Sequence, residues 1–215
     1  MDPSLYVVLD RTASRGRELE QILASAVAGG CRMVQLREKE WPSGRMLPLA
    51  TRLRDQSRRA GVTFIVNDRV DLAVAVEADG VHLGQDDLPA SVARTLLRPG
   101  MILGVSTHSV EQARAAQAAG ADYVAVGSMF ATVSKPDFQL VGPGLIRALR
   151  SQMRVPLVGI GGITPDNVTE VIAAGADGVA VISAVCGAAD PTAASRRFVE
   201  RIEAARSLTG RVRPL

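Results

Sequence analysis

The sequence of 215 residues has few cysteines, few aromatic residues and no long apolar run. Its two cysteines, Cys31 and Cys186, lie far apart and lack metal-ligand spacing. We therefore expect buried free thiols rather than a disulfide or a zinc site. No apolar segment approaches the ~20 residues that a membrane span needs, and residues 1–10 lack the pattern of a signal peptide. The expectation is a cytoplasmic protein that does not bind membranes.

Aromatic residues make up only 3% of the chain, which leaves little surface on which nucleic-acid bases could stack. The net charge is +3, from 25 Lys and Arg against 22 Asp and Glu, and the arginines are scattered rather than clustered. Nucleic acid is therefore not an expected partner. Most basic residues are expected on solvated helix surface, and a few are available to attract an anionic small molecule.

Short apolar runs alternate with segments of helical periodicity along the whole chain. The runs are rich in β-branched residues and do not alternate with polar ones, which is typical of buried parallel strands. Strands are expected at residues 5–10, 33–36, 63–66, 80–83, 102–106, 123–126, 157–160 and 178–182. Helices are expected at residues 18–28, 43–60, 70–77, 90–97, 110–119, 145–152, 164–174 and 191–206.

Eight strands alternating with helices fit an α/β fold of the closed (β/α)8 type, a TIM barrel. An open doubly wound sheet uses the same local pattern, but no Gly-x-Gly-x-x-Gly follows the first strand and no linker divides the chain. Ala-Gly-Ala-Asp precedes a strand at 119–122 and at 174–177, which marks repeated units. We expect one domain over residues 1–215, with a flexible tail after about residue 207.

In a TIM barrel the chemistry lies at the C-terminal ends of the strands. Asp68 and Asp87 follow the third and fourth strands. Either Asp68 caps the helix that begins near Val70 and Asp87 ends a polar turn, or the two bind Mg²⁺. Mg²⁺ accepts one or two carboxylates and takes its other ligands from water and substrate phosphate. Spacing alone does not decide. The cations Arg37, Lys39 and Lys135, from two loops at one mouth, favour a metal with a polyanion such as a diphosphate.

A second anion site is indicated after the last two strands. Gly159-Ile160-Gly161-Gly162 follows the seventh strand, and a helix is expected to begin near Ser183 after the eighth. Glycines let main-chain amides approach an anion, and a helix start adds further amides and a positive dipole end. Glycine also serves tight turns, but this position in a barrel favours a phosphate site.

Seven motifs occur in one order along the chain: QLREK (35–39), ND (67–68), GQDD (84–87), GVSTH (104–108), TVSKPD (132–137), VGIGGI (158–163) and VISA (181–184). Together they resemble the thiamine-phosphate synthase family, from about residue 5 to residue 202. The resemblance implies a transferase that joins 4-amino-5-hydroxymethyl-2-methylpyrimidine diphosphate to thiazole phosphate and releases diphosphate. It implies small phosphorylated substrates and one Mg²⁺ per active site, and it leaves a homo-oligomer open.

The resemblance also implies a role for each matching residue. Those implied to bind the pyrimidine diphosphate are Gln35, Leu36, Arg37, Glu38, Lys39, Asn67, Ser106 and Lys135. Those implied to bind thiazole phosphate are Thr132, Val133, Ser134, Gly162, Ile182 and Ser183. Asp68 and Asp87 would hold Mg²⁺, and Lys135, Arg37 and Ser106 would be catalytic. Cations on the leaving group suit a reaction in which diphosphate departs first and no nucleophilic side chain is needed.

The chain departs from the family pattern at Ser128 and Ala131, where proline is common, and this puts the loop conformation in doubt rather than its ligands. A thiazole tautomerase of the same superfamily stays an alternative, although it needs no diphosphate site and tends to carry histidine in place of Ser128. A non-catalytic, regulatory phosphate-binding barrel is the third. His82 is expected to be packed and hydrogen-bonded, and no role is assigned to it or to His108.

Overall fold

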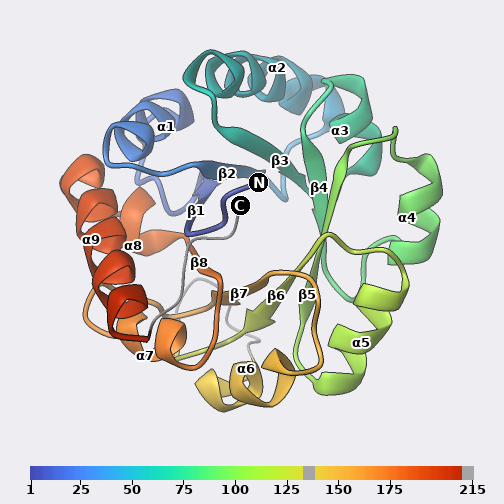
Figure 1. Ribbon diagram of the computed structural model, residues 1–215. Coiled ribbons are helices and arrows are strands. Elements are labelled where there is room, and N and C mark those ends of the chain that lie inside the picture. Colours follow the sequence, from blue (N-terminus) through green and yellow to red (C-terminus); the bar gives the residue numbers. More distant parts are fainter. Residues whose placement is uncertain (133–138, 210–215) are drawn as a thin grey trace.

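The computed structural model describes residues 1–132 and 139–209. Eight parallel strands form a closed barrel in sequence order, and β1 (Leu5–Asp10) pairs with β8 (Gly178–Val181) to complete the ring. Figure 1 looks along the barrel axis and shows the helices as an outer ring. The predicted TIM barrel is therefore confirmed, and the open doubly wound sheet is excluded by the pairing of the first strand with the last.

The strands lie within one residue of the predicted ranges. Between β1 and β8 they are β2 (Met33–Arg37), β3 (Thr63–Asn67), β4 (Gly80–Leu83), β5 (Ile102–Thr107), β6 (Tyr123–Gly127) and β7 (Leu157–Ile160). Several strands run one residue further than predicted, into polar residues such as Arg37 and Asn67. The reason is that a parallel ladder is made by main-chain groups, so a polar side chain at its end does not stop the pairing.

The helices follow the predicted order, and the helix expected to begin near Ser183 is a single short turn after β8. They are α1 (Leu19–Ala28), α2 (Ser43–Ala60), α3 (Val70–Ala75), α4 (Ala90–Leu96), α5 (Val110–Ala118), α6 (Gly142–Arg150), α7 (Val168–Ala173), α8 (Ser183–Cys186) and α9 (Pro191–Thr209). Two starts differ from the prediction by more than one residue. α6 begins three residues earlier, and α7 begins four residues later because Thr164 opens a turn in which its amide donates to Asn167 Oδ1 at 2.8 Å.

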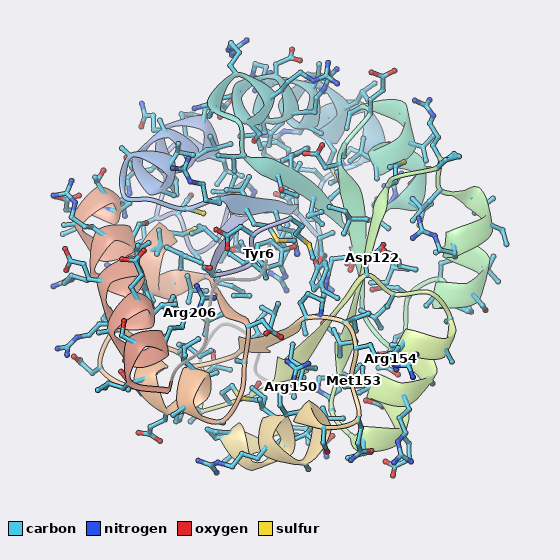
Figure 2. All side chains as sticks on the ribbon, viewed as in Figure 1. Tyr6, Asp122, Arg150, Met153, Arg154 and Arg206 are labelled. Carbon is cyan, nitrogen blue, oxygen red and sulfur yellow. The ribbon has the colours of Figure 1, made fainter. Side chains whose placement is uncertain are left out.

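Two apolar cores follow from the alternation of side chains along each strand. Outward residues pack against the helices and form the larger core. Inward residues fill the barrel in a smaller cluster of Tyr6, Val8, Met33, Ile65, Tyr123, Val158 and Ala180. Figure 2 shows Tyr6 near the middle of the ring of strands. The barrel thus has a packed interior and is not a pore.

The aspartates that recur just before strands have a structural role: at the N-terminal end of the barrel they bind the main chain of a neighbouring strand. Asp79, Asp122 and Asp177 directly precede β4, β6 and β8. Each forms two hydrogen bonds with one residue of the preceding strand, β3, β5 or β7. The aspartate amide donates to that residue's carbonyl, and the carboxylate accepts from its amide. The three carboxylate contacts are Asp79 with Phe64 (2.7 Å), Asp122 with Leu103 (2.7 Å) and Asp177 with Leu157 (2.8 Å).

Cys31 and Cys186 are buried and free, as predicted. Burial raises the pKa of the Cys31 thiol to about 12 and that of Cys186 to about 11, and both thiols donate to main-chain carbonyls. Within residues 1–132 and 139–209, no helix combines the length and the apolar character that crossing a bilayer requires.

Candidate active site

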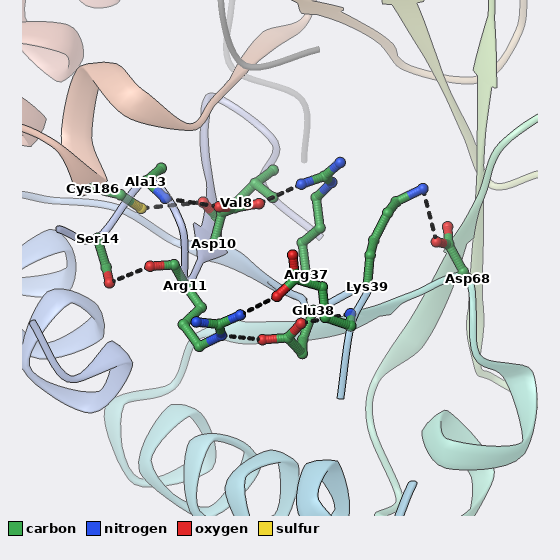
Figure 3. A network of polar contacts seen from close by, with 11 residues as sticks. Val8, Asp10, Arg11, Ala13, Ser14, Arg37, Glu38, Lys39, Asp68 and Cys186 are labelled. Carbon is green, nitrogen blue, oxygen red and sulfur yellow. Dashed lines mark hydrogen bonds and ion pairs between the residues drawn. The ribbon is translucent and has the colours of Figure 1, made fainter. Parts of the chain in front are cut away.

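Arg37 ends β2 and lies at the C-terminal mouth of the barrel. Strand register places it beside Asp10, the last residue of β1, and its guanidinium donates to Asp10 Oδ2. The other oxygen, Asp10 Oδ1, accepts from the amide of Ala13 at 2.9 Å. The carboxylate therefore orients the guanidinium, as Figure 3 shows. Asp10 was missed by the sequence analysis, although its place at the end of the first strand, next to Arg37, is the signal that could have found it.

Asp68 and Asp87, predicted to form a pair, are brought together across the ends of β3 and β4. Their side chains are in contact, and the Lys39 ammonium lies 3.3 Å from Asp68 Oδ2. Asp87 Oδ2 also accepts from the Gly84 amide at 2.6 Å. Asp68 has a φ of 63°, in the left-handed region that costs energy for residues other than glycine. The turn is held nonetheless, because the Asp68 amide donates to His82 O at 2.8 Å.

The electrostatics of this pair fit a divalent cation. Burial, together with the neighbouring Asp87, raises the pKa of Asp68 to about 6, while Lys39 opposes the rise. Two carboxylates that repel one another form a site that a cation would stabilise. In the described part of the chain, no group of three or more His, Cys, Asp or Glu side chains could hold a metal. A pair of carboxylates without further protein ligands suits Mg²⁺ and not a structural zinc ion.

Three of the predicted pyrimidine-site residues point into the barrel near its mouth. Gln35 and Asn67 are buried, with 3% and 8% exposure, and Ser106 is half-buried. Leu36 points the other way, into the outer core, with 0% exposure. Any contact of Leu36 with a ligand at the mouth must therefore come from its main chain.

Glu38, also a predicted pyrimidine-site residue, holds the loop after β2. Its carboxylate accepts from Arg11 Nε at 2.6 Å and from the Glu40 amide at 2.7 Å. Burial of the carboxyl favours its neutral form, but these two donors outweigh burial and lower its pKa. Trp41 in the same loop lies against Arg11 and Arg45, whose guanidinium carbons are 5.3 and 3.7 Å from the ring centre, so it anchors the loop.

The loop after β6 is closed at its base by Ser128. Its amide donates to Gln139 O at 2.9 Å, and its carbonyl accepts from the Val141 amide at 3.0 Å. A proline at this position would have no amide hydrogen for the first of these bonds. The serine that departs from the family pattern therefore holds the two ends of the loop together. Three predicted site residues of this loop, Val133, Ser134 and Lys135, lie outside the described residues.

The glycines after β7 pack directly against the loop after β6. Gly161 O accepts from the Phe130 amide at 3.0 Å, and Gly162 has a φ of 64°. A Cβ atom on Gly162 would lie 2.4 Å from Ala131 O, so a larger residue would displace the loop that leads into Thr132. The glycines thus bring the loop that leads into Thr132 next to Gly162, as well as serving their own turn.

The other half of the predicted phosphate site lies where β8 leads into α8. Ser183 is the first residue of α8 and is exposed, and Ile182 next to it is half-buried. The first amides to bond within the turn are those of Val185 and Cys186, which donate to Ile182 O at 3.2 and 2.9 Å. The sequence prediction of a helix beginning near Ser183 is confirmed, and this helix is only four residues long.

The two histidines have different surroundings. His82 is buried inside the barrel and hydrogen-bonded on both ring nitrogens, as the sequence led us to expect. His108 lies between β5 and α5, where its Nδ1 donates to Gly127 O at 2.5 Å and its amide donates to Gln112 Oε1 at 2.7 Å. Its imidazole therefore ties the end of β6 to the start of α5.

Comparison with known proteins agrees with this geometry. The family model described as thiamine monophosphate synthase matches residues 5–185. The chain is 54% identical to the thiamine-phosphate synthase of Moorella thermoacetica, covering 94% of this chain and 97% of that one, and 50% identical to that of Methanoculleus marisnigri, covering 96% and 99%. Among solved structures, thiamine phosphate pyrophosphorylase from Pyrococcus furiosus superposes with a TM-score of 0.87 at 39% identity, covering 94% of this chain and 96% of that one. The chain therefore belongs to the thiamine monophosphate synthase family.

Proposed function

We propose that this protein is a thiamine-phosphate synthase, which transfers the pyrimidine-methyl group of 4-amino-5-hydroxymethyl-2-methylpyrimidine diphosphate to the nitrogen of thiazole phosphate. The observation that carries the proposal is the pairing of Asp68 and Asp87 beside Lys39, with Arg37 at the same mouth. Two acids and two cations at one end of a barrel match a metal-bound diphosphate, and the glycine turn after β7 offers a separate place for the second phosphate.

The proposed reaction needs positive charge where diphosphate leaves. The C–O bond between the pyrimidine methyl carbon and diphosphate breaks, and both electrons depart with diphosphate. The lone pair of the thiazole nitrogen then forms the new C–N bond, and the positive charge ends on the thiazolium ring without any proton transfer. Arg37, oriented by Asp10, and Lys39 would neutralise the departing group. Lys135 is proposed to do the same from the loop after β6.

Mg²⁺ is proposed to bind to Asp68 and Asp87. When bound, it would supply further positive charge to the diphosphate oxygens. The role of the protein is to keep the two carboxylates close and to limit their exposure. The Gly84 amide on Asp87 and Lys39 on Asp68 hold these side chains in place.

The pyrimidine ring would be held by Gln35 of β2, Asn67 of β3 and Ser106 of β5, because all three lie near the mouth. Thr132, Gly162, Ile182 and Ser183 would hold the thiazole phosphate. A thiazole tautomerase would need only the second of these sites. The acid pair with Lys39 and the 54% identity to a thiamine-phosphate synthase favour the transferase.

The test is an assay of the purified protein with both substrates and Mg²⁺. Thiamine phosphate and diphosphate should form in equal amounts, and neither should form when one substrate is omitted. A protein that isomerises a thiazole carboxylate phosphate but makes no thiamine phosphate would be a tautomerase. A protein that binds the phosphates with neither activity would be a regulatory barrel, and either result rejects the proposal.

A further inference from the structure

Five side chains form an unbroken chain of hydrogen bonds across the barrel interior, from Gln35 to Ser106. Gln35 Nε2 donates to the Tyr6 hydroxyl, which lies 3.0 Å from the Tyr123 hydroxyl. The Tyr123 hydroxyl lies 2.8 Å from His82 Nδ1, and His82 Nε2 lies 2.8 Å from Ser106 Oγ. This hydrogen-bonded chain links Gln35 and Ser106, which the resemblance to thiamine-phosphate synthases assigns to pyrimidine binding. The three residues between them, Tyr6, Tyr123 and His82, have no assigned role.

The hydrogen bonds of this chain all point the same way, from Gln35 towards Ser106, because each hydroxyl has only one hydrogen to donate. Tyr6 accepts from Gln35, so its hydrogen is available for the Tyr123 oxygen. Tyr123 then donates to His82 Nδ1, which must be the unprotonated nitrogen of the ring. His82 carries its hydrogen on Nε2 and donates to Ser106 Oγ. The hydrogen of the Ser106 hydroxyl is left to donate to a ligand at the mouth.

The middle of the chain is sealed from water, which makes its direction persistent. Tyr6, Tyr123 and His82 are only 1%, 0% and 6% exposed. The His82 ring stacks on the Tyr123 ring with centroids 5.5 Å apart, and both of its nitrogens meet neutral hydroxyls. A neutral imidazole has one donor and one acceptor, so reversing one bond requires reversing all of them.

We propose that Tyr6, Tyr123 and His82 are positioning residues that fix the Ser106 hydroxyl as a hydrogen-bond donor and thereby select a pyrimidine ring with a bare, accepting nitrogen. The inference rests on the proposed function for the identity of the ligand. The inference goes beyond the proposed function because it names a basis of specificity: the site recognises the hydrogen-bond donors and acceptors of the pyrimidine ring as well as the diphosphate. An oxo group in place of the ring's amino group puts a hydrogen on a ring nitrogen, and that hydrogen would face the serine hydrogen.

The first test reads the direction of the chain without using activity. The sequence has two histidines, and ¹⁵N NMR of untagged protein distinguishes the two neutral tautomers. His82 should show the Nε2–H form. His108 serves as an internal reference for the other tautomer, Nδ1–H, because its Nδ1 donates to the carbonyl of Gly127. In Tyr123→Phe, which removes only the hydroxyl, His82 should lose its strong tautomer preference. An Nδ1–H form of His82 in the wild type overturns the proposal.

The second test uses the 4-oxo analogue of the pyrimidine diphosphate. Wild type should prefer the amino compound by about 10- to 100-fold in kcat/KM, the range expected when a donor is left facing a donor. Tyr123→Phe frees the Ser106 hydroxyl to rotate, so the preference should fall about tenfold, and the KM for thiazole phosphate should stay within about twofold. Tyr6→Phe breaks the same chain and should act in the same direction.

The matched control is Thr107→Val, which removes a buried hydroxyl next to Ser106. Thr107 Oγ1 donates to Ala125 O at 3.2 Å and takes no part in the chain, so this variant should keep the wild-type preference for the amino compound. An unchanged preference in Tyr123→Phe and Tyr6→Phe, or an equal loss in Thr107→Val, overturns the proposal. If wild type makes no thiamine phosphate, the proposed function fails, and the His82 tautomer still decides the direction of the chain.

Discussion

The two ends of the barrel use the same residue type in opposite ways. At the N-terminal end, Asp122 and Asp177 each accept a main-chain amide and pair with an arginine, at 2.9 Å for Arg94 and 2.6 Å for Arg150. At the C-terminal end, Asp68 lies against another carboxyl group, and Lys39 at 3.3 Å offsets the repulsion only in part. In the first arrangement one carboxylate oxygen accepts from both an amide and a guanidinium, and in the second the carboxylate faces another acid.

This difference shows where stability and function reside in the chain. A carboxylate with complete hydrogen bonds stabilises the fold and has little left to offer a ligand. A carboxylate whose pKa is raised by burial and by a neighbouring acid is a weaker contributor to stability and a better binding group for a metal. Substitutions at the two ends should therefore separate activity from stability.

Asp68→Asn should lower kcat/KM by about two to three orders of magnitude, the range found when one charge-stabilising group is lost. The change removes a proposed Mg²⁺ ligand at the mouth, so the melting temperature should hold or rise, because a repelling charge is also removed. Activity as a function of Mg²⁺ concentration and thermal unfolding are the measurements. Wild-type activity in Asp68→Asn, or wild-type activity in excess EDTA, would show that the pair does not hold a catalytic metal.

Lys135→Ala should lower kcat by roughly one to three orders of magnitude and change thiazole-phosphate binding little. The chain has only two lysines, Lys39 and Lys135, so modification of amines reports almost entirely on this site. Bound pyrimidine diphosphate should protect both lysines, as read by mass spectrometry. A wild-type kcat in Lys135→Ala would make this lysine a surface charge.

Asp177→Ala should lower the free energy of unfolding by about 1–3 kcal/mol, because the Leu157 amide and Arg150 lose a partner. Its kcat/KM at 25 °C should stay within about threefold of the wild type. Arg98→Ala is the control, since Arg98 makes an exposed pair with Glu77 at 3.4 Å and its loss should cost less than about 0.5 kcal/mol. A large loss of activity in folded Asp177→Ala would mean that the two ends are coupled.

Asp10→Asn should raise the KM for pyrimidine diphosphate about tenfold, because the charge-assisted bond that orients Arg37 is weakened. The asparagine keeps an oxygen for the Ala13 amide, so the turn after β1 should be preserved. Steady-state kinetics with each substrate varied in turn measures the effect. A fall in KM would show that Asp10 neutralises the guanidinium more than it orients it.

The order of the elements could be predicted from the sequence because it depends on local patterns. Short β-branched runs gave the eight strands to within one residue, and glycine-terminated amphipathic segments gave most of the helices. The position of a residue just after a strand was enough to place Asp68 and Asp87 at one mouth, since parallel strands end at the same edge. The start of α7 was wrong because a side chain, that of Asn167, caps a turn there.

Tertiary structure alone decided which partners each polar residue has. Asp10 and Asp68 look alike in the sequence, yet one is matched with Arg37 and the other lies beside Asp87. Tyr6 and His82 are ordinary strand residues until closure of the barrel brings them, through Tyr123, into one hydrogen-bonded chain. The reason is physical: alternation along a strand fixes the face on which a side chain lies, but strand register and barrel closure fix what it meets there.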